Sequence, residues 1–159
     1  MTDTAPAQPA AQQPFQVAVY TQYVRDLSFE SPQAPQIFSQ LQTPPALDMG
    51  INVQTRKMDG DAHEVMLLLK LEAKVADKIA FIAELAYGGV FGLPPVAPEQ
   101  ERVFLLVEAP RLLFPFARQI IANAVRDGGF PQVLVNPVDF GALYLQQQGA
   151  MEQPPQGNA

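Results

Sequence analysis

The sequence predicts an α+β fold in which a four-stranded antiparallel sheet packs on helices. Apolar and polar residues alternate over most of the first half of the chain, which is typical of strands that bury one face. The apolar spacing then changes to that of helices in the second half. A length of 159 residues is sufficient for one domain with a hydrophobic core.

Two terminal segments, residues 1–14 and 149–159, are predicted to be disordered tails. Both consist largely of Ala, Pro, Gln and other residues with small or polar side chains. Such segments cannot bury enough apolar surface to offset the entropy lost on ordering. Residues 15–148 are therefore predicted to form a single domain.

Four strands are predicted in succession. The first covers residues 15–30 and the second covers residues 47–57. Asp59-Gly60 is a typical hairpin turn and leads into the third strand, and a turn near Ala76-Asp77 leads into the fourth. This order favours an antiparallel sheet.

A proline-rich loop is predicted between the first two strands. Residues 31–48 contain four prolines, which rule out a central strand and disfavour a helix. The same segment carries several large apolar side chains, and long loops of this kind are often functional.

Two helices are predicted after the strands. The first begins at Pro98 and runs to about Glu108, because Pro110 disfavours helical backbone in the residue before it. The second covers residues 112–126, and Gly128-Gly129 ends it.

A last helix is predicted after an extended connector. Asn136-Pro137 is expected to cap this helix. Asp139 then occupies the capping-box position, where Glu or Gln is more usual.

The composition disfavours enzymes and nucleic-acid binding. The formal net charge of −6 disfavours contact with phosphates. The chain has no cysteine, and its only histidine is His63, so neither a catalytic triad nor a zinc site is predicted. No apolar run reaches the ~18 residues of a membrane span, and the N-terminal residues do not resemble a secretory signal. These observations predict a cytoplasmic protein without a metal or cofactor.

One surface pattern favours a protein partner. Asp26, Glu30 and Glu84 share the predicted outer sheet face with Ile82, and they form one patch if the first and fourth strands are neighbours. Acidic residues around an exposed aliphatic side chain suit a basic protein partner. An ordinary solvent-facing sheet gives the same alternation, and the pattern alone favours that interpretation.

Three stretches resemble the SecB-type protein-export chaperones of bacteria. They are YVRDLSFESPQAPQIF (23–38), IAFIAELAYGGVFGL (79–93) and LLFPFARQIIANAVRDGGFPQVLVNPVDFGALYLQQQ (112–148). The resemblance implies a subunit of a homotetramer, assembled as a dimer of dimers. It also implies an ATP-independent holdase, without enzymatic activity, that keeps preproteins unfolded in the cytoplasm and delivers them to the ATPase of the Sec translocase.

The resemblance implies two binding surfaces. The positions that match the translocase-binding residues of the family are Asp26, Glu30, Ile82 and Glu84. A preprotein-binding groove is expected between the proline-rich loop and the last helix. Its candidate lining residues are Phe38, Leu41, Leu47, Met49, Phe140, Leu143 and Tyr144. Each of these seven side chains fits the core of the subunit equally well.

Two departures from the family affect the expected groove. Leu41-Gln42 stand where many relatives have a tryptophan, and the hairpin before Asp59-Gly60 is slightly longer than usual. Two other functions remain open. A general holdase that is not tied to export would differ only in lacking the translocase interaction. An oligomeric α+β module that binds small molecules would carry a bound metabolite when purified.

Overall fold

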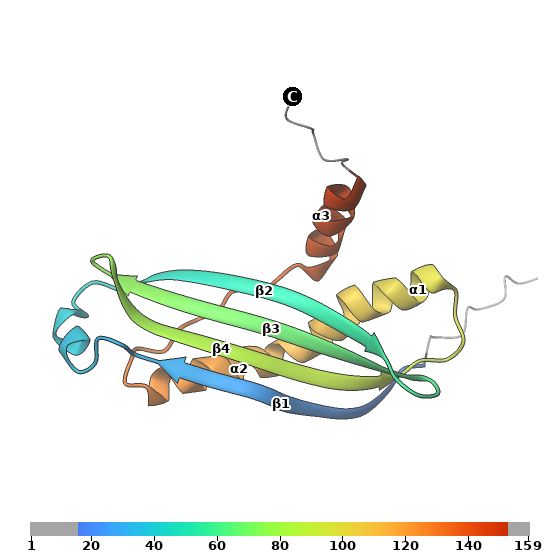
Figure 1. The fold of residues 1–159 in the computed structure, drawn as a ribbon, viewed down its shortest axis with the longest axis horizontal. Coiled ribbons are helices and arrows are strands. Elements are labelled where there is room, and N and C mark those ends of the chain that lie inside the picture. Colours follow the sequence, from blue (N-terminus) through green and yellow to red (C-terminus); the bar gives the residue numbers. More distant parts are fainter. Residues whose placement is uncertain (1–15, 153–159) are drawn as a thin grey trace, which may run out of the picture.

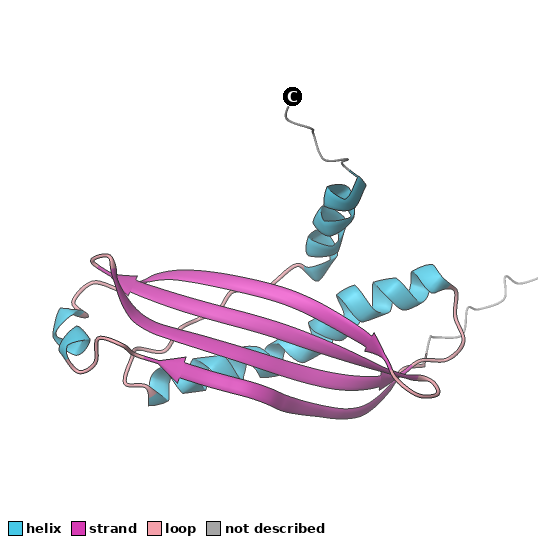
Figure 2. Cartoon of the chain, viewed as in Figure 1, coloured by secondary structure: helices cyan, strands magenta, loops and turns pink. Residues whose placement is uncertain are grey.

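Four antiparallel strands form one sheet in the order β1-β4-β3-β2. The structure, a computed structural model, describes residues 16–152. The strands are β1 (Ala18–Glu30), β2 (Ala46–Lys57), β3 (Ala62–Val75) and β4 (Lys78–Gly92). Long helices run along one side of this twisted sheet (Figure 1), and Figure 2 shows the same division between strands and helices. The predicted α+β fold class is confirmed.

The two sides of the sheet differ in burial, as alternation predicts. On β4, Phe81, Ala83 and Leu85 are at most 2% exposed and pack with the helices. Ile82 and Glu84 lie between them and point to the opposite side. We call the helix-covered side the inner face and the opposite side the outer face.

The pairing of β1 with β4 contains two irregularities. The register shifts between Val19 and Thr21 and again between Val24 and Asp26, which are β-bulges that insert Tyr20 and Arg25. The pairing of β2 with β3 is regular over its whole length. A bulge redirects the side chains of its strand, and this matters for the outer face described below.

Both predicted hairpin turns are present. Gly60 has a φ of 68° in the turn between β2 and β3, a conformation that glycine adopts without strain. Ala76 and Asp77 have φ values of 47° and 63° in the turn between β3 and β4. Two successive residues with positive φ are typical of the tight hairpin turns that match the twist of a sheet.

The predicted break before Pro110 is wrong, because one continuous helical segment covers both predicted helices. It consists of α1 (Pro98–Val103), a π-helical segment (Phe104–Glu108) and α2 (Ala109–Asp127). The Ala109 N–H donates to the carbonyl of Phe104, five residues earlier. The wider π turn accommodates the proline ring, which in an α-helix meets the carbonyl four residues before it.

The end of α2 confirms the predicted glycine stop. Gly129 has a φ of 90°, and its N–H donates to the Arg126 carbonyl at 2.9 Å. The Phe130 N–H donates to the Val125 carbonyl at 3.3 Å. This pair of hydrogen bonds is the Schellman motif. The chain therefore reverses at this point and returns along the helix.

The last helix, α3 (Phe140–Glu152), begins later than predicted. The side chain of Asp139 accepts a hydrogen bond from the Ala142 N–H at 3.0 Å, so Asp139 is the N-cap. Asn136-Pro137, the predicted cap, lies in the extended connector. The helix continues four residues beyond 148, where the domain was predicted to end. The predicted disordered tail 149–159 is therefore wrong for residues 149–152, which are helical. The predicted tail 1–14 and residues 153–159 lie outside the described residues.

The proline-rich loop is anchored in the core mainly by Ile37. Its 3-10 helix, Gln36–Gln40, buries Ile37 completely. The Ser31 hydroxyl donates to the Ala80 carbonyl at 2.9 Å and fixes the start of the loop. Within residues 16–152, no helix is both long and apolar enough to cross a membrane.

Candidate functional site

The acidic patch, which comprises Asp26, Glu30, Ile82 and Glu84, lies on neighbouring strands of the outer face. Glu30 lies opposite Ile82 in the pairing of β1 with β4, and Asp26 lies opposite Ala86. Glu84 lies between these pairs, opposite Ser28. The neighbouring strands that the patch requires are therefore present. Its role in docking stays a prediction.

The patch is negatively charged and accessible. The Glu84 carboxylate lies 3.6 Å from the Lys70 ammonium, and these side chains are 50% and 55% exposed. An exposed ion pair of this kind contributes little to stability. Among the described residues, Asp26 and Glu30 make no ion pair and no side-chain hydrogen bond. Their carboxylates are therefore free to meet a basic partner.

The β-bulge at Arg25 adds a basic part to the outer face. Strict alternation places Arg25 on the inner face, opposite to Asp26. The bulge instead brings it to a cavity of about 360 Å³. That cavity is lined by Arg25, Gln54, Thr55, Arg56, Glu64 and Met66. This basic part could not be predicted from the sequence, because a bulge breaks the period of two on which the prediction of strand faces rests.

Two tyrosines of β1 lie against glycines of β4 at the same end of the outer face. A Cβ atom at Gly88 would lie only 2.8 Å from Cζ of Tyr23. A Cβ atom at Gly92 would clash with the ring of Tyr20. Only glycine leaves room for these rings, so this end of the outer face is filled by aromatic packing. No local pattern could reveal contacts between residues so far apart in the sequence.

Acidic partners hold both tyrosines in place. The Tyr23 hydroxyl donates to Glu64, whose carboxylate also pairs with Arg56 at 3.0 Å. The Tyr20 hydroxyl donates to Asp61 at 2.9 Å. Burial and then the bond to Glu64 raise the pKa of Tyr23, while the bond to Asp61 raises the pKa of Tyr20. Both phenols therefore stay protonated donors at neutral pH.

The candidate groove residues near the proline-rich loop are partly accessible. Phe38 is 39% exposed, and its ring centroid lies 5.1 Å from that of Phe130. Leu47 lies on the inner face of β2 and is 46% exposed. Leu41 and Met49 pack partly against the core. Phe38 and Leu47 are therefore available to a bound chain.

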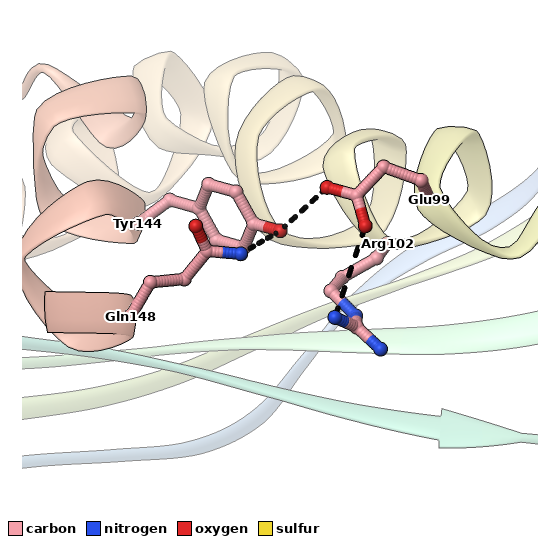
Figure 3. A network of polar contacts seen from close by, with 4 residues as sticks. All are labelled: Glu99, Arg102, Tyr144 and Gln148. Atoms are coloured by element: carbon pink, nitrogen blue, oxygen red, sulfur yellow. Dashed lines mark hydrogen bonds and ion pairs between the residues drawn. The ribbon is translucent and has the colours of Figure 1, made fainter. Parts of the chain in front are cut away.

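The candidate groove residues of α3 attach this helix to the long helical segment. Phe140 is 1% exposed, and its ring meets Phe114 edge-on with centroids 5.8 Å apart. The Tyr144 hydroxyl donates to Glu99 at 3.2 Å and accepts from Gln148 at 2.6 Å (Figure 3). Tyr144 is 9% exposed, so it serves mainly as an attachment point in the single subunit.

The two groups of groove candidates lie apart in the subunit. The loop with Phe38 is at one end of the sheet, whereas α3 stands beside α1 (Figure 1). Leu143 is partly buried against the core, like Leu41 and Met49. A groove lined by all seven residues therefore stays a prediction. In a single subunit it would require α3 to move.

His63 has a structural position. It is 5% exposed, and its Nδ1 lies 3.2 Å from the Asp61 carbonyl oxygen. Its Nε2 lies 3.4 Å from the Glu101 carboxylate, which is an electrostatic contact without hydrogen-bond alignment. The ring thus connects β3 to α1. Among the side chains that the structure describes, no group of three or more His, Cys, Asp or Glu could hold a metal ion.

Comparisons with known proteins agree on one family. The profile described as preprotein translocase subunit SecB matches residues 9–151. The protein-export protein SecB of Afipia carboxidovorans is 47% identical over 146 residues, which cover 92% of this chain and 91% of that protein. The protein-export protein SecB of Granulibacter bethesdensis is 45% identical over 165 residues, which cover 99% and 95%.

A solved structure supports the fold. The SecB-like chaperone Rv1957 of Mycobacterium tuberculosis was solved in complex with a ChAD peptide from the HigA1 antitoxin Rv1956. It matches with a TM-score of 0.65 and covers 77% of this chain and 90% of its own length. The sequences are only 12% identical, so this likeness concerns the fold alone.

Proposed function

The chain belongs to the SecB family and is a chaperone of protein export, not an enzyme, and from this premise we propose how it works. It is an ATP-independent holdase that keeps preproteins unfolded in the cytoplasm and delivers them to the ATPase of the Sec translocase. The observation that carries the proposal is the separation of two surfaces. The acidic patch lies on the outer face, while exposed apolar side chains such as Leu47 lie on the inner face.

Client binding relies on apolar contacts that tolerate many sequences. Phe38 and Leu47 are exposed in the subunit, as are Leu134 at 85% and Leu145 at 66%. Burial of apolar surface is worth about 25 cal/mol per Å², so each such contact alone is weak. A long unfolded chain that meets many contacts at once gains from effective concentration. Preproteins are therefore held without any requirement for a folded motif.

Release proceeds by competition and not by ATP hydrolysis. Binding of the unfolded state opposes folding of the client by mass action, and a stronger binder can take the client over. The acidic patch steers a basic surface of the translocase ATPase to the outer face, since opposite charges mainly increase the rate of association. Docking on the outer face leaves the exposed apolar side chains Phe38 and Leu47 accessible to the client during transfer.

A homotetramer, assembled as a dimer of dimers, is part of this proposal. Leu112 and Phe116 are 49% and 50% exposed on α2. Large apolar side chains on the free side of a helix are typical of an interface. Ile121 and Val125 are unavailable for this role, because they are buried in the subunit core. Sedimentation of the purified protein should give a mass near four times 17.4 kDa.

The decisive experiment separates the two surfaces. The double variant Asp26→Lys with Glu84→Lys should lose binding to the purified translocase ATPase in a pull-down. It should still suppress aggregation of a denatured preprotein without ATP. The control Asp59→Lys with Asp127→Lys makes the same change in net charge outside the patch and should keep both activities. Retention of the ATPase by the patch variant at ordinary salt would remove the patch from the mechanism.

A general holdase outside export is the second candidate. Exposed apolar side chains such as Phe38 and Leu47 would serve such a holdase equally well, because client binding does not need the acidic patch. The same pull-down distinguishes the two candidates. If the wild-type chain protects clients but never binds the translocase ATPase, the general holdase is correct.

A further inference from the structure

The centre of the outer face contains a hollow of about 440 Å³. The hollow crosses the whole sheet, because Asn52 on β2, Leu68 on β3 and Ala86 on β4 lie in one row that ends at Asp26. Its floor is apolar except for Asn52 at the β2 end, and its rim is charged. The floor includes Gly50, Leu68 and Ala86, and the rim includes Asp26, Lys70 and Glu84.

Gly50 is the unusual residue of this hollow. Gly88 and Gly92 are required because aromatic rings occupy the space of their missing side chains. A Cβ atom at Gly50 would meet only the Cβ of Lys70, at 4.0 Å, and the backbone of Gly50 lies outside the left-handed region. Nothing within the described residues therefore requires glycine at position 50. Glycine weakens a strand, and it often marks a place that another molecule approaches closely.

We propose that the hollow receives an aliphatic side chain from a basic segment of the docking partner. This inference rests on the proposed function and adds the chemistry of the partner. Leu68 and Ala86 offer an apolar floor without polar side-chain groups, which suits an aliphatic group. Asp26 and Glu30 are unpaired among the described residues, so the residues that flank this group in the partner are Lys or Arg. An apolar anchor inside a ring of polar contacts is the usual form of an interface centre.

Charge argues against other occupants. A second copy of this chain has a net charge of −6, and two acidic patches would repel each other across such a contact. An unfolded client is held by apolar burial, for which an acidic rim gives no advantage. The partner is therefore a basic chain with an exposed aliphatic residue.

The first test fills the hollow without harming the fold. Gly50→Val places its side chain in open space and favours a strand, so the variant should fold at least as well as the wild type. Its Kd for the purified translocase ATPase should rise at least tenfold. The control Ala46→Val adds an apolar side chain to the same face of the same strand, outside the hollow, and should leave the Kd unchanged.

Three outcomes of this titration would overturn the proposal. One is an unchanged Kd in Gly50→Val. A second is loss of client protection in this variant, which would show that the client binds in the hollow. The third is loss of the oligomer in sedimentation, which would show that a second copy of the chain binds there.

A second test does not depend on the ATPase. The peptides Lys-Arg-Leu-Arg-Lys and Lys-Arg-Gly-Arg-Lys are titrated into the methyl-labelled wild-type protein. Only the leucine peptide should shift the methyl signals of Leu68 and Ala86, and Gly50→Val should abolish this difference. Equal shifts with both peptides would contradict binding of an aliphatic side chain in the hollow, without contradicting delivery to the translocase. A leucine-dependent shift in a protein that never binds the ATPase would support binding in the hollow and contradict delivery.

Discussion

The two faces of the sheet differ in burial, because alternate residues of the same strand point to opposite sides. On the inner face, Phe81 is 1% exposed and packs against Phe29 and Phe130. Its neighbour Ile82 points outward beside Glu30. A step of one residue therefore separates a core position from a position on the solvent-facing side. The outer face is itself divided, since tyrosines fill one end and the hollow and the acidic patch occupy the rest.

The largest effect on stability is expected from Phe81→Ala. Removal of a buried phenylalanine costs about 3–5 kcal/mol, because both transfer energy and packing are lost. Ile82→Ala, on the outer face, should cost less than about 1 kcal/mol, since that side chain is already partly in water. Urea unfolding monitored by circular dichroism gives both values. Equal costs would mean that the two faces are not separate in the way described.

Gly88→Ala should have the next largest effect, although this residue is on the outer face. The new Cβ atom would lie 2.8 Å from Cζ of Tyr23 and 2.9 Å from Cε of Met66. Overpacking of this kind costs about 1–3 kcal/mol. Tyr23→Ala in the same chain should recover part of the loss by vacating the space. A Gly88→Ala protein as stable as the wild type would show that this end of the outer face is not tightly filled.

Tyr144→Ala should affect α3 more than the rest of the fold. The variant loses the hydrogen bond to Glu99, which holds α3 on α1, and the bond from Gln148, which lies within α3. Hydrogen exchange should increase in residues 140–152 and stay unchanged in the sheet. Affinity for an unfolded polypeptide, measured by fluorescence titration, should fall severalfold while the oligomer survives. Unchanged affinity would exclude Tyr144 from the client-binding surface.

The smallest effect is expected from Tyr23→Phe, and it depends on pH. The pKa of Tyr23 in the folded chain is raised above its ordinary value of 10.0. A raised pKa means that the protonated phenol stabilises the fold fully below pH 10 and that this stabilisation is lost as the pH rises through the folded-state pKa. The wild type should therefore lose stability above pH 10 more steeply than Tyr23→Phe. Urea midpoints on either side of that pH measure the difference, and parallel curves would contradict it.

The sequence predicted the strands and the acidic patch well, because both depend on a period of two. No bulge lies between Asp26 and Glu30 or between Ile82 and Glu84, so alternation placed all four residues on one face correctly. The basic part of the outer face was missed for the opposite reason. The bulge at Arg25 exists only relative to β4, a strand far away in the sequence.

The helices show a different limit of local prediction. Pro110 was expected to end a helix, and the chain instead widens one turn around it. Asp139 was expected inside a capping box and is itself the cap of α3. Both residues are genuine boundary signals, but the packing of the helices on the sheet and on each other decides which of several compatible boundaries forms. The hollow at Gly50 could not be predicted for a similar reason, since it is formed by residues of four paired strands.

The π-helical segment fixes the number of residues between α1 and α2. A π turn takes about one residue more than an α-helical turn, in which each residue turns the chain by about 100°. Deletion of a single residue within Phe104–Glu108 would therefore convert the wide turn into an ordinary one and leave Leu113 and Ile121 facing the core. The cost would be a contact between the Pro110 ring and the carbonyl four residues before it. A deletion within α2 itself has no extra residue to remove, so it would rotate the rest of that helix by about 100°.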